Sequence, residues 1–157
     1  MKSKNEKCIF CKIVKKQIES FVIKENKNFM AILDIYPQTK GQTLIISKKH
    51  YTSDPLKLPS EILKDGIEFA QQIGKLLIKK LGAKRVFFVI EGMEIDHFHI
   101  KLYPFYKISS KIIPTDLINL SMESYPGFLI TLHGPRANKN ELKIILEKLK
   151  INHKRIK

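Results

Sequence analysis

One segment near the centre of the chain, residues 96–104, constrains the fold most. It reads Asp-His-Phe-His-Ile-Lys-Leu-Tyr-Pro, and from its first histidine onward polar and apolar residues alternate. Successive side chains of a strand point to opposite faces, so the two kinds would lie on different sides of a sheet. The polar face would carry His97, His99, Lys101 and Tyr103, and the core face Phe98, Ile100 and Leu102. In a helix, residues two apart point to nearly opposite sides, so we expect a strand here.

Other short apolar runs are expected to form the rest of a sheet. Three of them precede the segment and predict an antiparallel meander: Phe21–Ile23, Phe29–Leu33 and Thr43–Ser47. Polar residues 25–28 separate the first two, and a turn at 39–41 leads into the third. Two more runs, Val86–Ile90 and Phe128–Leu132, predict a buried strand and a strand near the C-terminal end.

Helical spacing of apolar residues occurs in three places. The first is Cys8–Gln17, and the longest is 60–81, where Ser60 could cap the N-terminus and Gly82 would end the helix. The long helix is expected to bury one stripe, made of Ile62, Leu63, Ile67, Ala70, Ile73 and Leu77. Asn138 or Asn140 could cap a last helix, which carries Leu142, Ile145, Leu146 and Leu149. The order predicts an α+β fold: an antiparallel sheet, a long helix after the third strand and a C-terminal helical extension.

The formal net charge of +14 raises the question of nucleic-acid binding. Only three of the 29 Lys and Arg residues are arginine, and the lysines are spread along the whole chain. Aromatic residues are not interleaved with them in the pattern of a base-stacking surface. We therefore do not expect a nucleic-acid partner, although the positive field would attract polyanions such as nucleoside polyphosphates.

Neither a membrane anchor nor a leader peptide is expected. The longest apolar runs are about five residues, far short of the ~20 that span a bilayer. The first seven residues are charged, but no sustained apolar stretch follows them. We expect a cytoplasmic protein.

The two cysteines, Cys8 and Cys11, are three residues apart. In a reducing compartment this spacing indicates metal or redox chemistry rather than a structural disulfide. A redox pair would sit at the start of a helix that follows a βαβ strand, and only a charged segment precedes Cys8. A zinc site would need two more ligands, for which His50 and His97 are available. Spacing alone leaves both readings open.

Several segments taken together resemble the histidine triad (HIT) superfamily. They are Cys-Ile-Phe-Cys-Lys-Ile at 8–13, Leu-Asp-Ile-Tyr-Pro at 33–37, Gly-Gln-Thr-Leu-Ile-Ile at 41–46, Lys49-His50, and Gly92 five residues before His97-Phe98-His99. The similarity covers roughly residues 8–104. It implies a nucleotide-binding α+β homodimer that hydrolyses or transfers nucleotides at an α-phosphate.

The resemblance also implies roles for individual residues. His99, the middle histidine of the motif, would be the nucleophile that forms a nucleotidyl-histidine intermediate. His97 would join Cys8, Cys11 and His50 in a structural Zn²⁺ site. Asp34 would bind the ribose hydroxyls, although a turn-forming aspartate before Pro37 is the alternative. The base pocket would be lined by Phe10, Ile13, Ile32 and Ile35, which could equally be plain core residues.

These roles suit the residue types. A neutral imidazole can attack phosphorus and later leave, provided that its other nitrogen is hydrogen-bonded, and we expect a neighbouring strand to supply the carbonyl acceptor. An ionised Asp34 is an acceptor only, which matches a vicinal diol.

The sequence departs from the family pattern at two places. Lys101 replaces the third histidine, and we interpret it as a catalytic fixed charge that meets the transferring phosphate and lowers the pKa of His99. The alternative is a lysine that extends to solvent. Before the motif, the loop is short and carries Glu91 and Glu94 where polar phosphate-binding residues are common. They could bind a divalent ion carried by the substrate, or point away.

The chain continues beyond the resemblance. We expect a catalytic domain at 8–104, an extension packed on it at 105–151 and a frayed tail at 152–157. The suggestive part of the extension is Leu-His-Gly-Pro-Arg at 132–136. His133 could be a turn residue, or His133 and Arg136 could reach a phosphate in the same or the partner subunit.

Taken together, the sequence predicts a zinc-stabilised homodimeric enzyme, a hydrolase in preference to a transferase. Its substrate would be a purine nucleotide compound, either a dinucleoside polyphosphate or a nucleoside phosphoramidate. The alternative is a zinc-containing nucleotide-binding interaction module with little or no turnover.

Overall fold

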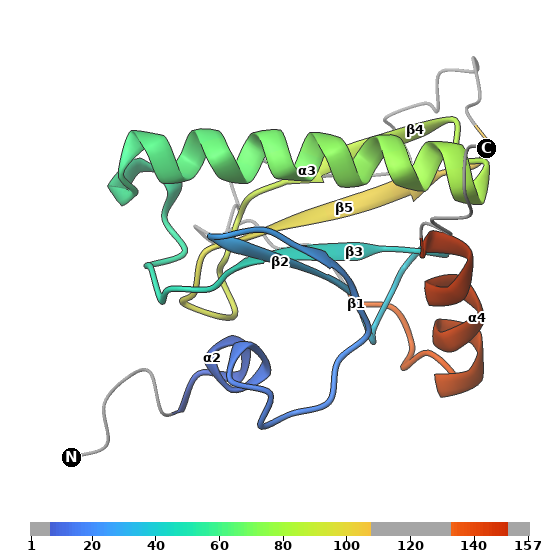
Figure 1. Ribbon diagram of the computed structural model, residues 1–157, viewed down its shortest axis with the longest axis horizontal. Helices are drawn as coiled ribbons and strands as arrows, with labels where there is room; N and C mark the ends of the chain where they lie inside the picture. The colour runs from blue at the N-terminus through green and yellow to red at the C-terminus, as the bar shows by residue number, and fades with distance from the viewer. Residues whose placement is uncertain (1–6, 108–132, 151–157) are drawn as a thin grey trace, which may run out of the picture.

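Five strands form one antiparallel sheet in the computed structural model, which describes residues 7–107 and 133–150 (Figure 1). In chain order the strands are β1 Val22–Glu25, β2 Phe29–Leu33, β3 Thr43–Ser47, β4 Arg85–Val89 and β5 His99–Phe105. Their order across the sheet is β1-β2-β3-β5-β4, so the predicted meander of the first three strands is confirmed. The helices are α2 Ile9–Val14, the 3₁₀ turn η1 Pro55–Lys57, α3 Ser60–Leu81 and α4 Lys139–Leu149.

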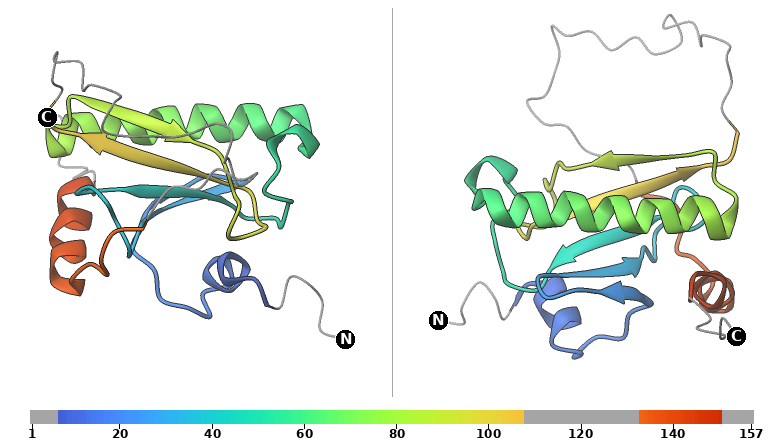
Figure 2. Two further views of the ribbon diagram at one scale, coloured as in Figure 1. Left: turned by 180° about the vertical axis from the view of Figure 1, so that it is seen from behind. Right: turned by 45° about the horizontal axis from the view of Figure 1, so that its top comes forward.

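The two faces of the sheet are covered by different helices (Figures 1 and 2). The long helix α3 packs along one face, and α4 packs against α3 and β1 at one end of the sheet. The short helix α2 lies on the opposite face. The core on the α3 side is built from Phe29, Ile45, Phe69, Ile73, Phe98, Ile100, Leu142 and their neighbours. The smaller core under α2 consists of Phe10, Ile13, Met30, Ile32, Leu44 and Ile46.

The strand β5 has the alternation that its sequence predicts. Phe98, Ile100 and Leu102 are buried in the α3-side core. Lys101 is paired across the sheet with Leu44 of the α2-side core, which places His99 and Lys101 on the face toward α2. That face is buried rather than solvent-exposed, because α2 and the segments around it cover it.

The helix α3 has the predicted bounds but differs in detail. Its N-cap position is Pro59 and no side chain caps it, so the prediction of a Ser60 cap is wrong. Phe69 faces the core and Ile67 is 38% exposed, so placing Ile67 in the buried stripe is also wrong. The helix lies so close to the sheet at Gly66 that a Cβ there would be 3.0 Å from Phe29 Cζ. The core-facing line therefore runs through positions 66, 69, 70, 73 and 77.

The predicted buried strand at 86–90 is in fact a partly exposed edge strand, β4. Its Phe87 and Phe88 side chains are 42% and 38% exposed. Strand order causes this, because β4 pairs with β5 on one side only. The apolar run was read correctly as a strand and wrongly as a buried one.

The remaining predictions fall partly within the described residues. The first helix is shorter than its predicted range, and β1 and β5 extend beyond theirs at the C-terminal end. The cap of α4 is Asn138, whose side chain accepts a hydrogen bond from Asn140 N. The predicted strand at 128–132 and the tail from 152 lie outside the described residues. Among those described, no helix combines the length and apolar character needed to cross a membrane.

Candidate functional site

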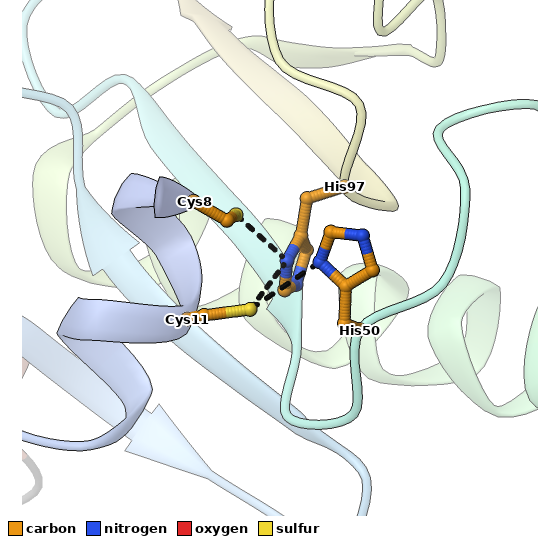
Figure 3. A group of neighbouring side chains, drawn as sticks. All are labelled: Cys8, Cys11, His50 and His97. Carbon is orange, nitrogen blue, oxygen red and sulfur yellow. Dashed lines mark hydrogen bonds between the residues drawn. The ribbon is translucent and has the colours of Figure 1, made fainter. Parts of the chain in front are cut away.

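Four potential metal ligands converge where α2 meets the sheet (Figure 3). Cys8 and Cys11 come from the N-terminal turn of α2, His50 follows β3, and His97 lies two residues before the start of β5. Their ligand atoms all lie within 4.8 Å of one another. Cys8 Sγ is 3.3 Å from His97 Nδ1, and Cys11 Sγ is 3.3 Å from His50 Nδ1 and 3.6 Å from His97 Nδ1. The structure thus brings together the four residues that the resemblance implied.

The chemistry of this group suits a bound metal ion. His97 is fully buried and its Nε2–H donates to the Ser47 carbonyl at 2.7 Å, which leaves Nδ1 facing the cysteines. Burial lowers the pKa of His97 to about 4, so the imidazole is a neutral ligand. Burial, with the Cys8 thiol beside it, raises the pKa of Cys11 to about 11. A metal cation would supply the positive charge that such a thiol needs in order to ionise.

His99 is oriented by a backbone carbonyl. Its Nδ1–H donates to the His97 carbonyl at 2.7 Å, so Nε2 is the nitrogen left for a reaction. The sequence predicted a carbonyl from a neighbouring strand, but the acceptor belongs to the residue two positions earlier on the same segment. Burial lowers the pKa of His99, and the Lys101 charge adds to that effect. The hydrogen bond to His97 and the nearby carboxylates act in the opposite direction.

His99 lies on the wall of a cavity of about 220 Å³ between α2, the end of β2 and the loop before β5. All the residues predicted for nucleotide binding and catalysis line it: Phe10, Ile13, Ile32, Asp34, Ile35, His99 and Lys101. The edge of the Phe10 ring contacts the His99 ring at 5.1 Å between centroids. Phe10, Ile13 and Ile32 are also members of the α2-side core, so they serve both as core and as cavity wall. Ile35 is half-exposed at the rim.

Asp34 is buried and rigidly held. One carboxylate oxygen accepts from Tyr36 N at 2.8 Å, and the other accepts from Gln42 Nε2 at 2.7 Å. The contact with Tyr36 is the turn interaction that the alternative reading predicted. Because each oxygen of an ionised carboxylate can accept a second hydrogen bond, Asp34 also keeps acceptors for a ligand. Sequence reasoning did not identify Gln42, which only the tertiary fold places beside Asp34.

Lys101 neither extends to solvent nor stands as an isolated charge. It forms an ion pair with Glu91, and the two side chains are only 9% and 5% exposed. Burial alone would raise the pKa of Glu91, but hydrogen bonds from Lys101 and from Met93 N outweigh it and lower the pKa. The Glu91 carboxylate is therefore ionised, and the pair lies beside His99 on the cavity wall.

The loop glutamate Glu94 and the C-terminal segment meet at the same cavity. His133 Nε2 lies 2.5 Å from a Glu94 carboxylate oxygen, and both residues line the cavity. Arg136 does not reach it in this subunit. It lines a separate cavity of about 670 Å³, together with Gln38, Lys40 and Asn138.

Comparison with known proteins gives three relevant similarities. The HIT domain family matches residues 15–107. An uncharacterised HIT-like protein of Methanocaldococcus jannaschii is 33% identical over 111 residues, which cover 68% of this chain and 84% of that protein. The adenosine 5′-monophosphoramidase HNT1 of Saccharomyces cerevisiae is 39% identical over 100 residues, 62% of this chain and 61% of its own length.

Among solved structures, a zinc-bound histidine triad family protein from Mycobacterium smegmatis has a similar fold. The TM-score is 0.68 at 22% identity, and the match covers 92% of this chain and 94% of that one. At this level of identity the likeness concerns the fold.

Proposed function

The chain belongs to the HIT domain family, and from that premise we propose that it is a nucleotide hydrolase or transferase acting at an α-phosphate. Its substrate would be a dinucleoside polyphosphate or a nucleoside phosphoramidate. One observation carries the proposal: His99 Nδ1 is tied to a carbonyl, so a neutral imidazole presents Nε2 to a cavity with apolar walls and a buried carboxylate. Support for the phosphoramidate comes from the yeast relative, which is an adenosine 5′-monophosphoramidase.

In the binding step, the apolar walls at Phe10, Ile13 and Ile32 take the base. The two carboxylate oxygens of Asp34 accept from the ribose hydroxyls. Tyr36 N and Gln42 hold that carboxylate in place, so little ordering is needed on binding. The α-phosphate then lies at the His99 and Lys101 side of the cavity.

The reaction proceeds in two displacements. First, the Nε2 lone pair of His99 forms a bond to the α-phosphorus, and the bond to the leaving group breaks with its electron pair on the leaving atom, which for an amine takes up a proton from solvent. Second, a water oxygen attacks the same phosphorus and loses a proton, the phosphorus–nitrogen bond breaks, and Nε2 recovers its lone pair. The products are the leaving group and a nucleoside monophosphate. In a transferase another acceptor replaces water.

Lys101 stabilises the negative charge of the transferring phosphate. In the ligand-free chain its ammonium is held by Glu91 on the wall that His99 shares. A phosphate oxygen can take up a hydrogen bond from the same ammonium, so the donor is in place before charge develops. Glu91 thus holds the buried lysine in position.

We assign the four-ligand group to a structural zinc ion. A tetrahedral zinc with usual bond lengths sets sulfur and nitrogen ligands about 3.5 Å apart, close to the sulfur–nitrogen distances of 3.3 and 3.6 Å here. Two thiols with two imidazoles are typical zinc ligands, and the Ser47 carbonyl fixes the His97 ring from behind. The ion would hold α2 against the sheet and would take no part in the reaction.

We also propose a homodimer that pairs through β4. The strand is at the edge of the sheet and carries half-exposed phenylalanines on both faces. Phe105 of β5, also exposed, lies against Phe87 and enlarges the apolar area. The opposite edge strand β1 ends in charged residues instead. A second copy of the chain is the occupant that this apolar edge fits.

One observation favours the alternative of a binding module with little turnover. Glu91 neutralises Lys101, so the phosphate meets an ion pair rather than a free cation. Such a pair could lower the rate while it leaves nucleotide affinity intact.

The decisive experiment offers diadenosine polyphosphates and adenosine 5′-phosphoramidate to the wild type and to His99→Ala. We expect the wild type to release AMP and the variant to be inactive, while AMP binding changes little because Asp34 and the apolar wall remain. A rapid acid-free quench of α-phosphate-labelled substrate should leave acid-labile label on the wild-type protein only. Turnover by His99→Ala would contradict the enzymatic proposal, and tight AMP binding without any turnover by the wild type would establish the binding module.

A further inference from the structure

The C-terminal segment 133–137 is built onto the rim of the nucleotide cavity. Gly134 N donates to the Tyr36 carbonyl and Ala137 N donates to the Ile35 carbonyl. The segments are so close that a Cβ on Gly134 would lie 2.0 Å from the Pro37 carbonyl oxygen. The Tyr36 and His133 rings also meet edge to face at 6.0 Å. These contacts place His133 at the cavity, although it lies outside the residues that match the HIT domain family.

The carboxylates of the cavity wall are all engaged within the described residues. Asp34 accepts from Gln42, Glu19 pairs with Lys139, and the two loop glutamates pair with Lys101 and His133. The three glutamates pair with Lys101, His133 and Lys139. Of these partners, Lys101 and His133 also line the cavity. The loop before β5 therefore does not present a bare acidic wall. It holds two hydrogen-bond donors at the cavity surface, and the second donor comes from the C-terminal segment.

We propose that His133, held by Glu94, binds the phosphate next to the α-phosphate and thereby selects substrates whose leaving group begins with a phosphate. The proposal rests on the function proposed above. A protonated His133 donates Nε2–H to Glu94 and has its Nδ1–H left for a phosphate oxygen. Lys101 serves the α-phosphate beside His99, and His133 serves the phosphate that departs. Leaving groups that begin with an amine gain nothing from this contact, so the site favours dinucleoside polyphosphates over phosphoramidates.

Glu94 acts here as a positioning residue. It fixes the imidazole through Nε2, in the way that a carboxylate orients a catalytic histidine in other enzymes. Tyr36 also contacts the His133 ring edge to face. The donor is therefore oriented before the substrate arrives, and the C-terminal segment belongs to the substrate site.

The test compares two ligands that differ by one phosphate and are not cleaved at the bond in question: AMP and α,β-methylene-ADP. Affinities are measured by calorimetry on the full chain. We expect His133→Ala to weaken α,β-methylene-ADP about tenfold, the usual size of a lost charge-assisted hydrogen bond. AMP affinity should change by less than about twofold, because AMP ends at the α-phosphate.

Three further variants control the interpretation. His133→Gln keeps an amide donor and should recover part of the lost affinity for α,β-methylene-ADP. Glu94→Gln keeps an acceptor for Nε2–H without the charge, so its loss should be smaller than that of His133→Ala. Lys148→Ala removes an exposed cation of α4 that does not line the cavity, and both affinities should stay the same.

The outcomes separate this inference from the proposed function. If the wild type binds neither ligand, the nucleotide function itself fails. If it binds AMP normally and His133→Ala weakens both ligands equally or neither, only the role of His133 is overturned. As a kinetic check, His133→Ala should lower kcat/KM for diadenosine triphosphate about tenfold and leave adenosine 5′-phosphoramidate unchanged. An equal fall for both substrates would contradict the proposed selectivity.

Discussion

Backbone carbonyls orient two histidines for different chemistry. The two are two residues apart and lie on one face of one segment. His97 gives its Nε2 proton to Ser47 and therefore turns Nδ1 toward the cysteines. His99 gives its Nδ1 proton to His97 and therefore keeps Nε2 for the cavity. Both are buried, and burial keeps both neutral. The same kind of side chain is thus a candidate metal ligand at His97 and a candidate nucleophile at His99.

At the residue scale we predict that Lys101→Met mainly lowers kcat. The substitution keeps the length of the side chain and removes the ammonium, so the transferring phosphate loses one preorganised donor. Such a loss typically costs on the order of 10²–10³-fold in rate. Steady-state kinetics with a diadenosine polyphosphate measure it, and Lys101→His, which introduces another donor, should recover part of the rate.

The same substitution should move the pH profile. Burial is the first cause of the lowered pKa of His99, and the Lys101 charge acts in the same direction while Glu91 opposes it. Removing Lys101 also leaves Glu91 uncompensated, so both changes raise the pKa of His99. The acidic limb of kcat/KM, where His99 becomes protonated and loses its lone pair, should therefore shift to higher pH. Glu91→Gln should shift it to lower pH, and an unmoved limb in both variants would rule out electrostatic coupling to His99.

Sequence reasoning reached the site at this scale because the signals were local. The alternation in 97–104 and the spacing of Cys8 and Cys11 place residue types on a face or a turn, and the resemblance supplied partners far away in sequence. Sequence reasoning did not identify the partners of Lys101, Asp34 and His133, which are Glu91, Gln42 and Glu94. Those contacts depend on which loops meet across the cavity, and no periodicity encodes that.

At the scale of the elements, the local sequence pattern predicted where strands and helices lie better than it predicted which of their residues are buried. The bounds of β2, β3 and α3 were predicted correctly, because β2 and β3 are short apolar runs between turns and α3 has a clear helical period. The burial of β4 was not, since an apolar run reads alike at the centre and at the edge of a sheet. Whether Ile67 or Phe69 faces the core depends on how α3 rotates over Phe29, which is set by the close approach at Gly66.

The edge strand β4 leads to a prediction about assembly. Phe87→Lys places a charge in the middle of the apolar edge, and a buried lysine without a partner opposes strand pairing between two copies. We expect the wild type to sediment as a dimer and Phe87→Lys as a folded monomer in analytical ultracentrifugation. Ile144→Lys, the same change at an exposed apolar residue of α4, is the matched control and should remain dimeric. A monomeric wild type would contradict the pairing through β4.

At the scale of the whole molecule, the four-ligand group ties together segments that are far apart in the chain. It joins the turn that opens α2, the segment that follows β3 and the segment that precedes β5. The α2-side core is small, so we expect α2 to depend on the four-ligand group for its attachment to the sheet. The helix α3 packs on a larger core.

We therefore predict that Cys8→Ser loses the metal and much of the stability. A loss of ~3 kcal/mol would lower Tm by roughly 10 °C in a domain of this size. Metal analysis should find about one zinc per wild-type chain and none in the variant. A strong chelator should lower the Tm of the wild type and leave that of Cys8→Ser unchanged. If the two proteins melt alike without chelator and neither contains metal, the cysteines have another role.

Phe10 lies between the two cysteines on α2, and its ring touches both histidines, at 5.6 Å from His97 and 5.1 Å from His99. Under the proposed assignments, one short helix belongs to two equilibria, the binding of an ion and the binding of a nucleotide. Such equilibria are reciprocal: the factor by which the ion tightens the nucleotide is the factor by which the nucleotide tightens the ion. If each ligand favours α2 packed on the sheet, saturating AMP should raise the chelator concentration that removes half of the proposed zinc.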